Sequence, residues 1–169
     1  MRILIISDTH GHEEGLKQLL KAVRPIDYMI HCGDTEGNED IIRKMAACPC
    51  TIVRGNNDFF SELPREEKVG FGKYRILVTH GHNYGVSMDT EMLKEEAKSG
   101  GYNVVMYGHT HKPSIDMSDP AITILNPGSL SYPRQSGRKP SYIMMDIDRF
   151  GEAHYTINYL KNIKSLYEW

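Results

Sequence analysis

Five short apolar segments of this chain each end in a small polar cluster, and this pattern narrows the choice of fold most. The segments are predicted strands at residues 3–6, 27–32, 51–54, 74–79 and 103–107. Short continuous apolar runs are typical of parallel strands that are buried on both faces. Because ligands of open α/β sheets bind beyond the carboxyl ends of the strands, we expect the five clusters to meet and form one site.

Amphipathic helices are predicted between the first three strands. Their apolar positions are Leu16, Leu19, Leu20 and Val23 in the first helix, and Ile41, Ile42, Met45 and Ala46 in the second. Further along, the pattern predicts an antiparallel pair at 66–69 and 74–79, a helix containing Met88, Met92 and Leu93, and strands at 122–125, 141–145 and 153–159. We interpret this order as one layered α/β domain over residues 1–169, with 161–169 as a C-terminal tail.

The composition excludes several classes of protein. The 169 residues are 40% hydrophobic and 25% charged, with a net charge of −2, so no overall basic field favours extended nucleic acid or a membrane surface. The longest apolar run has four residues, far short of the ~20 needed to span a bilayer. Three cysteines without an export signal fit reduced thiols, and hence a cytoplasmic location. Whether the protein forms a homo-oligomer is left open.

The histidines are clustered beyond chance. Eight histidines placed at random would give roughly 0.4 His-x-His pairs, whereas the chain contains three. These pairs are His10/His12, His80/His82 and His109/His111. Imidazole together with carboxylate and amide oxygen suits divalent ions such as Zn²⁺, Mn²⁺, Fe²⁺ and Ni²⁺. The clusters contain no cysteine, which argues against a closed structural zinc site or an iron–sulfur centre.

The number of polar residues favours two ions over one. Two carboxylates with several neutral ligands exceed what a single tetrahedral ion needs, so a pair of ions that share a carboxylate fits the count better. Two-metal sites, with ions ~3.5–4 Å apart, suit in-line displacement at phosphorus. Such a centre would carry net positive charge and would attract a phosphate anion.

The motifs, taken in order, resemble those of the calcineurin-like metallophosphoesterases. They are Asp8-x-His10, Gly33-Asp34, Gly55-Asn56-x-Asp58, His80-Gly81-His82 and Gly108-His109-Thr110-His111. Asn126-Pro127-Gly128-Ser129, which we expect to shape a loop under the site, and Pro133-Arg134 further resemble the small YfcE-type phosphodiesterases. The resemblance implies a four-layer αββα sandwich.

The resemblance also implies a ligand set for two divalent ions. The two expected sets are Asp8, His10, Asp34 and His111 for one ion, and Asp34, Asn56, His80 and His109 for the other. Mn²⁺ is the favoured ion, with Ni²⁺, Fe, Zn²⁺ and Mg²⁺ as alternatives. The implied activity is hydrolysis of a small phosphodiester, by in-line attack of a hydroxide that bridges the two metals and is positioned by the shared Asp34.

One position departs from the pattern of many relatives, which carry a histidine where this chain has Asn57. Asparagine can donate a hydrogen bond but cannot deliver a proton, and general acid catalysis is typically worth ~10²–10⁴ in rate. We therefore expect a preference for good leaving groups, or a substitute acid such as His12 or His82. Arg134 is a further candidate for contact with the phosphate, and Asp58 is expected to orient a neighbouring residue.

Several of these residues have an ordinary structural explanation when taken alone. Asp8 could cap the following helix, and Asp34 or Asn56 could form a turn. His12 and His82 could each take part in catalysis or simply lie in a solvated loop. At the level of the whole protein, the alternatives are a phosphomonoesterase, a protein or nucleotide phosphatase, and a non-catalytic interaction scaffold on the same fold.

Overall fold

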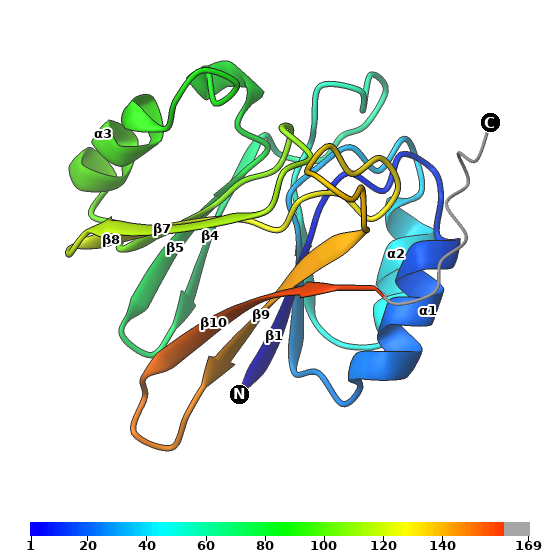
Figure 1. Ribbon diagram of the computed structural model, residues 1–169, viewed down its shortest axis with the longest axis horizontal. Helices are drawn as coiled ribbons and strands as arrows, with labels where there is room; N and C mark the ends of the chain where they lie inside the picture. The colour runs from blue at the N-terminus through cyan, green and yellow to red at the C-terminus, as the bar shows by residue number, and fades with distance from the viewer. Residues whose placement is uncertain (161–169) are drawn as a thin grey trace.

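Two five-stranded mixed sheets form the centre of the molecule (Figure 1) in a computed structural model that describes residues 1–160. The first sheet has the order β10 (Ala153–Tyr159), β9 (Ser141–Ile147), β1 (Arg2–Ile6), β2 (Tyr28–His31) and β3 (Cys50–Ile52). The second has the order β4 (Glu66–Phe71), β5 (Tyr74–Thr79), β6 (Val104–Met106), β8 (Ile122–Asn126) and β7 (Ser114–Asp119). Three neighbouring strands in each sheet run parallel: β1, β2 and β3 in the first, and β5, β6 and β8 in the second.

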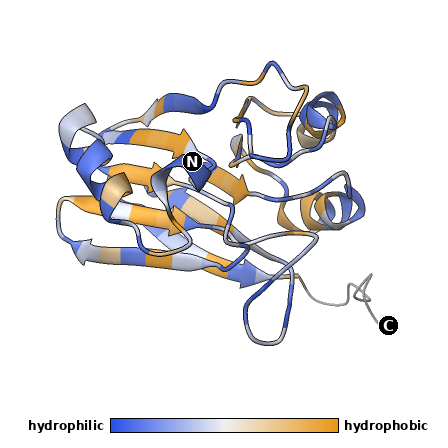
Figure 2. Ribbon diagram, turned by 90° about the horizontal axis from the view of Figure 1, so that it is seen from above, coloured by the Kyte–Doolittle hydropathy of each residue, from blue (hydrophilic) through white to orange (hydrophobic). Residues whose placement is uncertain are grey.

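Helices cover the outer face of each sheet. Helices α1 (Glu14–Val23) and α2 (Glu39–Ala46) pack on the first sheet, and α3 (Glu91–Gly100) packs on the second. Figure 2 shows the hydrophobic residues concentrated on the strands between these helices. The predicted four-layer αββα sandwich is therefore confirmed. Among residues 1–160, no helix has the length and apolar character needed to cross a membrane.

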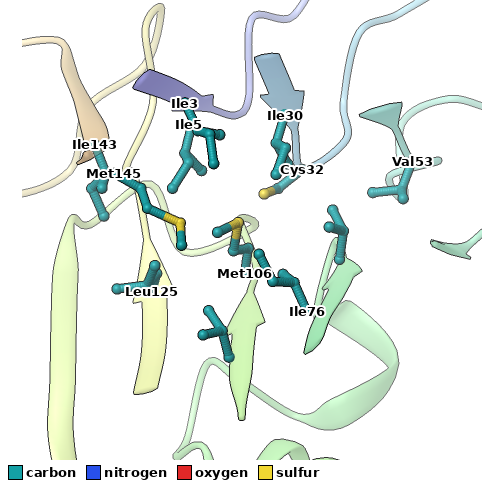
Figure 3. Packing of buried hydrophobic residues seen from close by; sticks show 12 residues of the cluster. Ile3, Ile5, Ile30, Cys32, Val53, Ile76, Met106, Leu125, Ile143 and Met145 are labelled. Atoms are coloured by element: carbon teal, nitrogen blue, oxygen red, sulfur yellow. The ribbon is translucent and has the colours of Figure 1, made fainter. Parts of the chain in front are cut away.

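The apolar run of β1 is continuous because both of its faces are buried. Ile3 and Ile5 point into the layer between the two sheets, where they belong to one apolar cluster with Ile76 and Leu125 of the second sheet (Figure 3). The alternate residues, such as Leu4, face the other way and pack with α1 and α2. Full burial of one such side chain stabilises the fold by about 1.5–3 kcal/mol. This double burial fixes where β1 ends, and hence where the first polar cluster begins.

Two sequence-based expectations were wrong in detail. Met88 does not belong to the predicted helix: α3 begins at Glu91, whose backbone N–H is bound by Asp89 Oδ1 at 3.0 Å, and Met88 is 92% exposed in the preceding turn. Strand β7 was not predicted, because its half-buried, polar sequence carries no clear apolar alternation. The prediction of one domain also includes residues 161–169, which lie outside the described residues.

The strand ends meet as expected, but from two sheets rather than along one. The loops after β1, β2 and β3 come from the first sheet, and those after β5 and β6 come from the second. In Figure 1 these loops gather at one end of the sandwich. The packing of the two sheets therefore brings the polar clusters together.

Candidate metal centre

Backbone hydrogen bonds tie the polar loops to one another. The N–H of Asp8 donates to Gly33 O at 3.0 Å, and the N–H of His10 donates to Asp34 O at 3.0 Å. Across the two sheets, the N–H of His109 donates to Asp8 Oδ2 at 3.1 Å. These bonds hold the loops after β1 and β2 of the first sheet and the loop after β6 of the second sheet in one fixed arrangement.

Most of the predicted ligands have left-handed backbone conformations. Their φ angles lie between 45° and 67° at Asp8, His10, Asp34, His109 and His111. Such conformations cost of order 1–3 kcal/mol each for residues other than glycine, and they concentrate at functional sites. The chain holds these side chains against the local preference of its backbone.

Two motif glycines allow close approach between a backbone and a carboxylate. A Cβ atom on Gly55 would lie 2.0 Å from Asp34 Oδ1, and one on Gly108 would lie 2.7 Å from Asp8 Oδ2. Any side chain at either position would displace an aspartate. This is the physical reason why glycine precedes Asn56 and His109 in their motifs.

The first predicted ligand set converges around Asp8 Oδ1. His111 Nε2 lies 3.1 Å from this oxygen, and His10 Nε2 lies 3.8 Å from it. The two Nε2 atoms are 3.2 Å apart. Ligand atoms bound tetrahedrally at 2.0–2.1 Å from one cation are on the order of 3.4 Å apart, so these separations fit a shared ion.

The second predicted set converges in the same way. Asn56 Oδ1 lies 3.0 Å from His80 Nε2 and 2.8 Å from His109 Nδ1. Asp34 Oδ2 stands between the two sets, 3.4 Å from His80 Nε2 and 3.8 Å from His10 Nε2. The structure thus brings all seven predicted ligands together, with Asp34 between the two sets.

The orientation of the imidazoles fits a cation. His80 Nδ1 donates to Cys32 O at 2.6 Å, and His111 Nδ1 donates to Tyr132 O at 2.7 Å. A carbonyl can only accept, so each ring carries its proton on Nδ1 and, when neutral, turns the lone pair of Nε2 towards the aspartates. Metal-binding histidines characteristically donate their other ring nitrogen to a carbonyl or carboxylate in this way.

The fully buried Asp8 gives a second, independent indication. Its Oδ1 atom accepts no hydrogen bond, although a buried acceptor without a partner costs about 1–3 kcal/mol. A cation coordinated by this oxygen would remove that cost. The residues at this position therefore fit divalent metal ions.

The aspartates favour positive charge at the centre. Burial alone would lower the pKa of His80, but the hydrogen bond to Asp34 and the charges of Asp8 and Asp34 raise it to about 9. Burial would raise the pKa of Asp8, yet His111 and His80 outweigh burial and hold that pKa below its usual value. The same balance, led by His80, lowers the pKa of Asp34. Both carboxylates are therefore ionised and available as ligands at neutral pH.

Asp58 holds the loop of Asp34 against the loop of Asn56. It is 2% exposed and accepts hydrogen bonds from the backbone N–H groups of Asp34 at 2.9 Å, Glu36 at 2.6 Å and Gly55 at 2.7 Å. A carboxylate suits this position because every group facing it is a donor. The prediction that Asp58 orients a neighbour agrees with these contacts.

The loop after β8 supports the centre from beneath. Asn126 Nδ2 donates to Gly108 O at 2.9 Å, and Ser129 Oγ donates to Asp8 O at 2.8 Å. Both side chains are fully buried. These bonds account for the Asn126-Pro127-Gly128-Ser129 motif as a brace for two ligand loops.

Asn57 lies directly against the central carboxylate. Its backbone N–H donates to Asp34 Oδ1 at 2.8 Å, and its Nδ2 donates to Asp34 Oδ2 at 2.8 Å. The side chain at this position therefore reaches the middle of the centre.

The remaining catalytic candidates lie further out. The half-buried ring of His82 is centred 5.4 Å from that of His80, and burial together with the charge of His80 lowers the pKa of His82. His12 is exposed, and its Nε2 lies 3.1 Å from the Tyr132 hydroxyl. Arg134 is exposed as well, and its backbone N–H donates to His111 O at 3.0 Å.

Sequence reasoning missed Glu36. Its Oε1 accepts a hydrogen bond from His10 Nδ1 at 2.8 Å and so fixes which nitrogen of His10 faces the aspartates. Its φ of 53° is also left-handed. The only signal in the sequence was its place two residues after Asp34, where a glutamate is otherwise unremarkable in a solvated loop.

Comparison with known proteins agrees with this geometry. Residues 1–149 match the model of the calcineurin-like phosphoesterase superfamily domain. The chain is 36% identical over 149 residues to the probable metallophosphoesterase YsnB of Bacillus subtilis, covering 88% of this chain and 85% of that protein. It is 29% identical over 146 residues to the phosphodiesterase MJ0936 of Methanocaldococcus jannaschii, covering 76% and 83%.

A solved structure shows the same fold. The crystal structure of a predicted phosphoesterase from Streptococcus pneumoniae superimposes with a TM-score of 0.76 at 26% identity, covering 94% of this chain and 97% of that one. The match of the family model extends over all seven predicted ligands. The chain belongs to the calcineurin-like phosphoesterase superfamily.

Proposed function

We propose that this protein is a dinuclear metal-dependent phosphodiesterase that hydrolyses a small phosphodiester. The observation that carries the proposal is the position of Asp34 Oδ2, which lies within 3.8 Å of His10 Nε2 in one ligand set and 3.4 Å of His80 Nε2 in the other. One oxygen between two groups of lone-pair donors is the arrangement that two ions with a shared ligand need.

The proposed roles of the residues follow from their positions. One ion would be held by Asp8, His10, Asp34 and His111, and the other by Asp34, Asn56, His80 and His109. Divalent ions in these sets would supply Lewis-acid charge for the phosphate and an activated water at neutral pH. The chain itself keeps both carboxylates ionised and holds the Nε2 lone pairs of His10, His80 and His111 in place through the carbonyl and carboxylate partners of Nδ1.

The protonation of the leaving group is the weak step of this centre. Asn57 can hold an oxygen by a hydrogen bond but has no proton to give. His82 has a lowered pKa and is therefore mostly neutral at pH 7. We infer that the enzyme prefers esters whose leaving group departs as a stable anion, and His12, His82 and Arg134 remain candidates for contact with the substrate.

The test combines metal analysis with hydrolysis of bis(p-nitrophenyl) phosphate, with and without a chelator. The proposal predicts two bound ions per chain, loss of activity on chelation, and recovery when Mn²⁺ is added back. Hydrolysis of p-nitrophenyl phosphate in parallel separates a diesterase from the monoesterase and phosphatase alternatives. Protein that binds no metal at saturation, or activity that chelation does not change, would favour the non-catalytic scaffold or another reaction.

Mn²⁺ as the physiological ion and a cytoplasmic location stay predictions. Substitution of Mn²⁺ by Ni²⁺, Fe²⁺, Zn²⁺ or Mg²⁺ in the same assay ranks the ions by kcat/KM. Mass measurement in solution decides whether the chain forms a homo-oligomer.

A further inference from the structure

A cavity of about 370 Å³ adjoins the candidate metal centre. Its walls are Glu36 and Gly37 in the loop before α2, Glu39 at the start of α2, and residues 57–61 after β3. Two of its lining residues also touch proposed ligands: Glu36 accepts from His10 Nδ1, and Asn57 donates to Asp34. The volume falls in the range of ~300–1,000 Å³ that is usual for small-molecule sites. Because a phosphodiester carries two organic arms, one of them needs a place next to the centre.

Two adjacent aromatic side chains line this cavity and are nearly free of other contacts. Phe59 is 70% exposed and Phe60 is 102% exposed. Two large apolar side chains exposed at consecutive positions are unfavourable in water and are typical of binding surfaces. A flat aromatic ligand stacks on such rings and removes them from solvent.

The charge of the cavity selects among aromatic ligands. Glu36 and Glu39 line it, and its lining within residues 1–160 includes no lysine or arginine. Glu39 makes only long contacts, with Thr35 Oγ1 at 3.3 Å and Ser61 Oγ at 3.4 Å, so its oxygens retain capacity to accept. Carboxylates repel a second phosphate and accept hydrogen bonds from amino groups.

We propose that this cavity binds the nucleoside arm of the substrate. The base stacks on Phe59 and Phe60, and its exocyclic amino group donates to the glutamates. The substrate class is then a nucleoside phosphodiester with no further phosphate on the bound arm. This inference rests on the proposed phosphodiesterase function, because it assumes that the phosphate lies at the metal centre.

The test is calorimetric titration of the Mn²⁺-loaded protein with adenosine 5′-monophosphate, ribose 5-phosphate and inorganic phosphate. Loss of one base-stacking ring typically weakens binding roughly 5- to 150-fold. We expect Phe60→Ala to weaken the binding of the nucleotide within this range and to leave ribose 5-phosphate and phosphate unchanged. Phe60→Trp should retain the affinity. Phe150→Ala, in the turn between β9 and β10 where Phe150 is 74% exposed, is the matched control and should change nothing.

The role of the glutamates is tested by comparing the affinities for adenosine and inosine 5′-monophosphates. The base of the first carries an amino group where the base of the second carries a carbonyl. The native protein should prefer the adenosine nucleotide by roughly 5- to 10-fold, and Glu39→Gln should narrow this preference. Equal affinities of the native protein for the two nucleotides would overturn the assignment of the amino group.

The two proposals fail in different ways. Equal binding of adenosine 5′-monophosphate and ribose 5-phosphate, in a protein that hydrolyses diesters, would overturn the nucleoside site and leave the proposed function standing. Absence of chelator-sensitive hydrolysis would overturn the proposed function, while the calorimetric difference between nucleotide and ribose phosphate would still decide whether the cavity binds the base.

Discussion

The layer between the two sheets and the loop cluster at their ends differ in how well each residue suits its place in the structure. In the layer, residues such as Ile3 and Ile76 are apolar, fully buried and in strands that suit them. In the loop cluster, Asp8 and Asp34 are buried charges on left-handed backbone. Local preference and burial agree in the first region and conflict in the second, which is the usual mark of a site kept for function at some cost in stability.

We expect the largest effect from a substitution in the loop cluster, which should lower activity far more than stability. Asp34→Asn removes the charge shared by both proposed ligand sets, and we expect kcat/KM for a diester to fall roughly 10³-fold, as when one strong electrostatic contact to a transition state is lost. The melting temperature of the metal-free protein should fall modestly, because the folded protein stabilises the Asp34 charge and both of its oxygens accept hydrogen bonds from Asn57. The control is Asp146→Asn, whose half-exposed side chain is paired with Arg2 and should leave the activity intact. Full activity of the Asp34 variant would contradict the comparison.

A substitution in the layer between the sheets should lower stability and leave activity unchanged. Ile5→Ala opens a cavity in the layer between the sheets, and it should lower the free energy of unfolding by about 2–5 kcal/mol. The kcat/KM of the protein that remains folded should stay near the native value. Denaturant titration measures the free energy of unfolding. The control is Ile41→Ala, at a half-exposed position in α2, which should lower this free energy by about 0.5 kcal/mol or less.

A residue that holds the ligand loops together should show a smaller effect on the site. Asp58 accepts from several backbone N–H groups, and Asp58→Asn would turn a donor towards them. We expect the affinity for Mn²⁺ to fall roughly 10- to 100-fold, because the loops of Asp34 and Asn56 lose their common partner. Titration with Mn²⁺ measures this. An unchanged affinity would mean that the ligand loops hold their geometry without Asp58.

We expect the smallest effect from a substitution that tests how the leaving group is protonated. Asn57→His restores a group that can deliver a proton beside Asp34. For substrates with poor leaving groups, such as alkyl esters, turnover should rise about tenfold, a part of the usual gain from a general acid. For p-nitrophenyl esters the rate should hardly change. If turnover of the alkyl esters did not rise, the inferred preference for good leaving groups would lose its basis.

The sequence predicted the structure well where a residue pattern is compatible with a single kind of structure or site. The run of aliphatic residues in β1 predicted a strand buried on both faces, and the paired histidines after β5 and β6 predicted the clusters that meet in the structure. Strand β7 was missed because its polar residues resemble a loop. Met88 was assigned to a helix because an apolar side chain gives the same signal whether it is buried or, as here, 92% exposed.

Other features of the site depend on geometry that no motif encodes. The left-handed φ of His109, the Asp8 Oδ1 that accepts no hydrogen bond and the bond from His10 to Glu36 arise only when separate loops pack together. The same holds for the cavity beside Phe60, whose walls come from different loops. Residue types therefore predicted which side chains meet at the site, whereas the contacts that orient them could not be predicted from the sequence.

The central claim is that residues far apart in the chain hold two cations around Asp34. It is tested most directly by the anomalous-scattering map of a crystal grown with saturating Mn²⁺. We predict two peaks ~3.5–4 Å apart on either side of the Asp34 carboxylate, with Asp8, His10 and His111 around one and Asn56, His80 and His109 around the other. A single peak, or peaks that Asp34 does not touch, would contradict it.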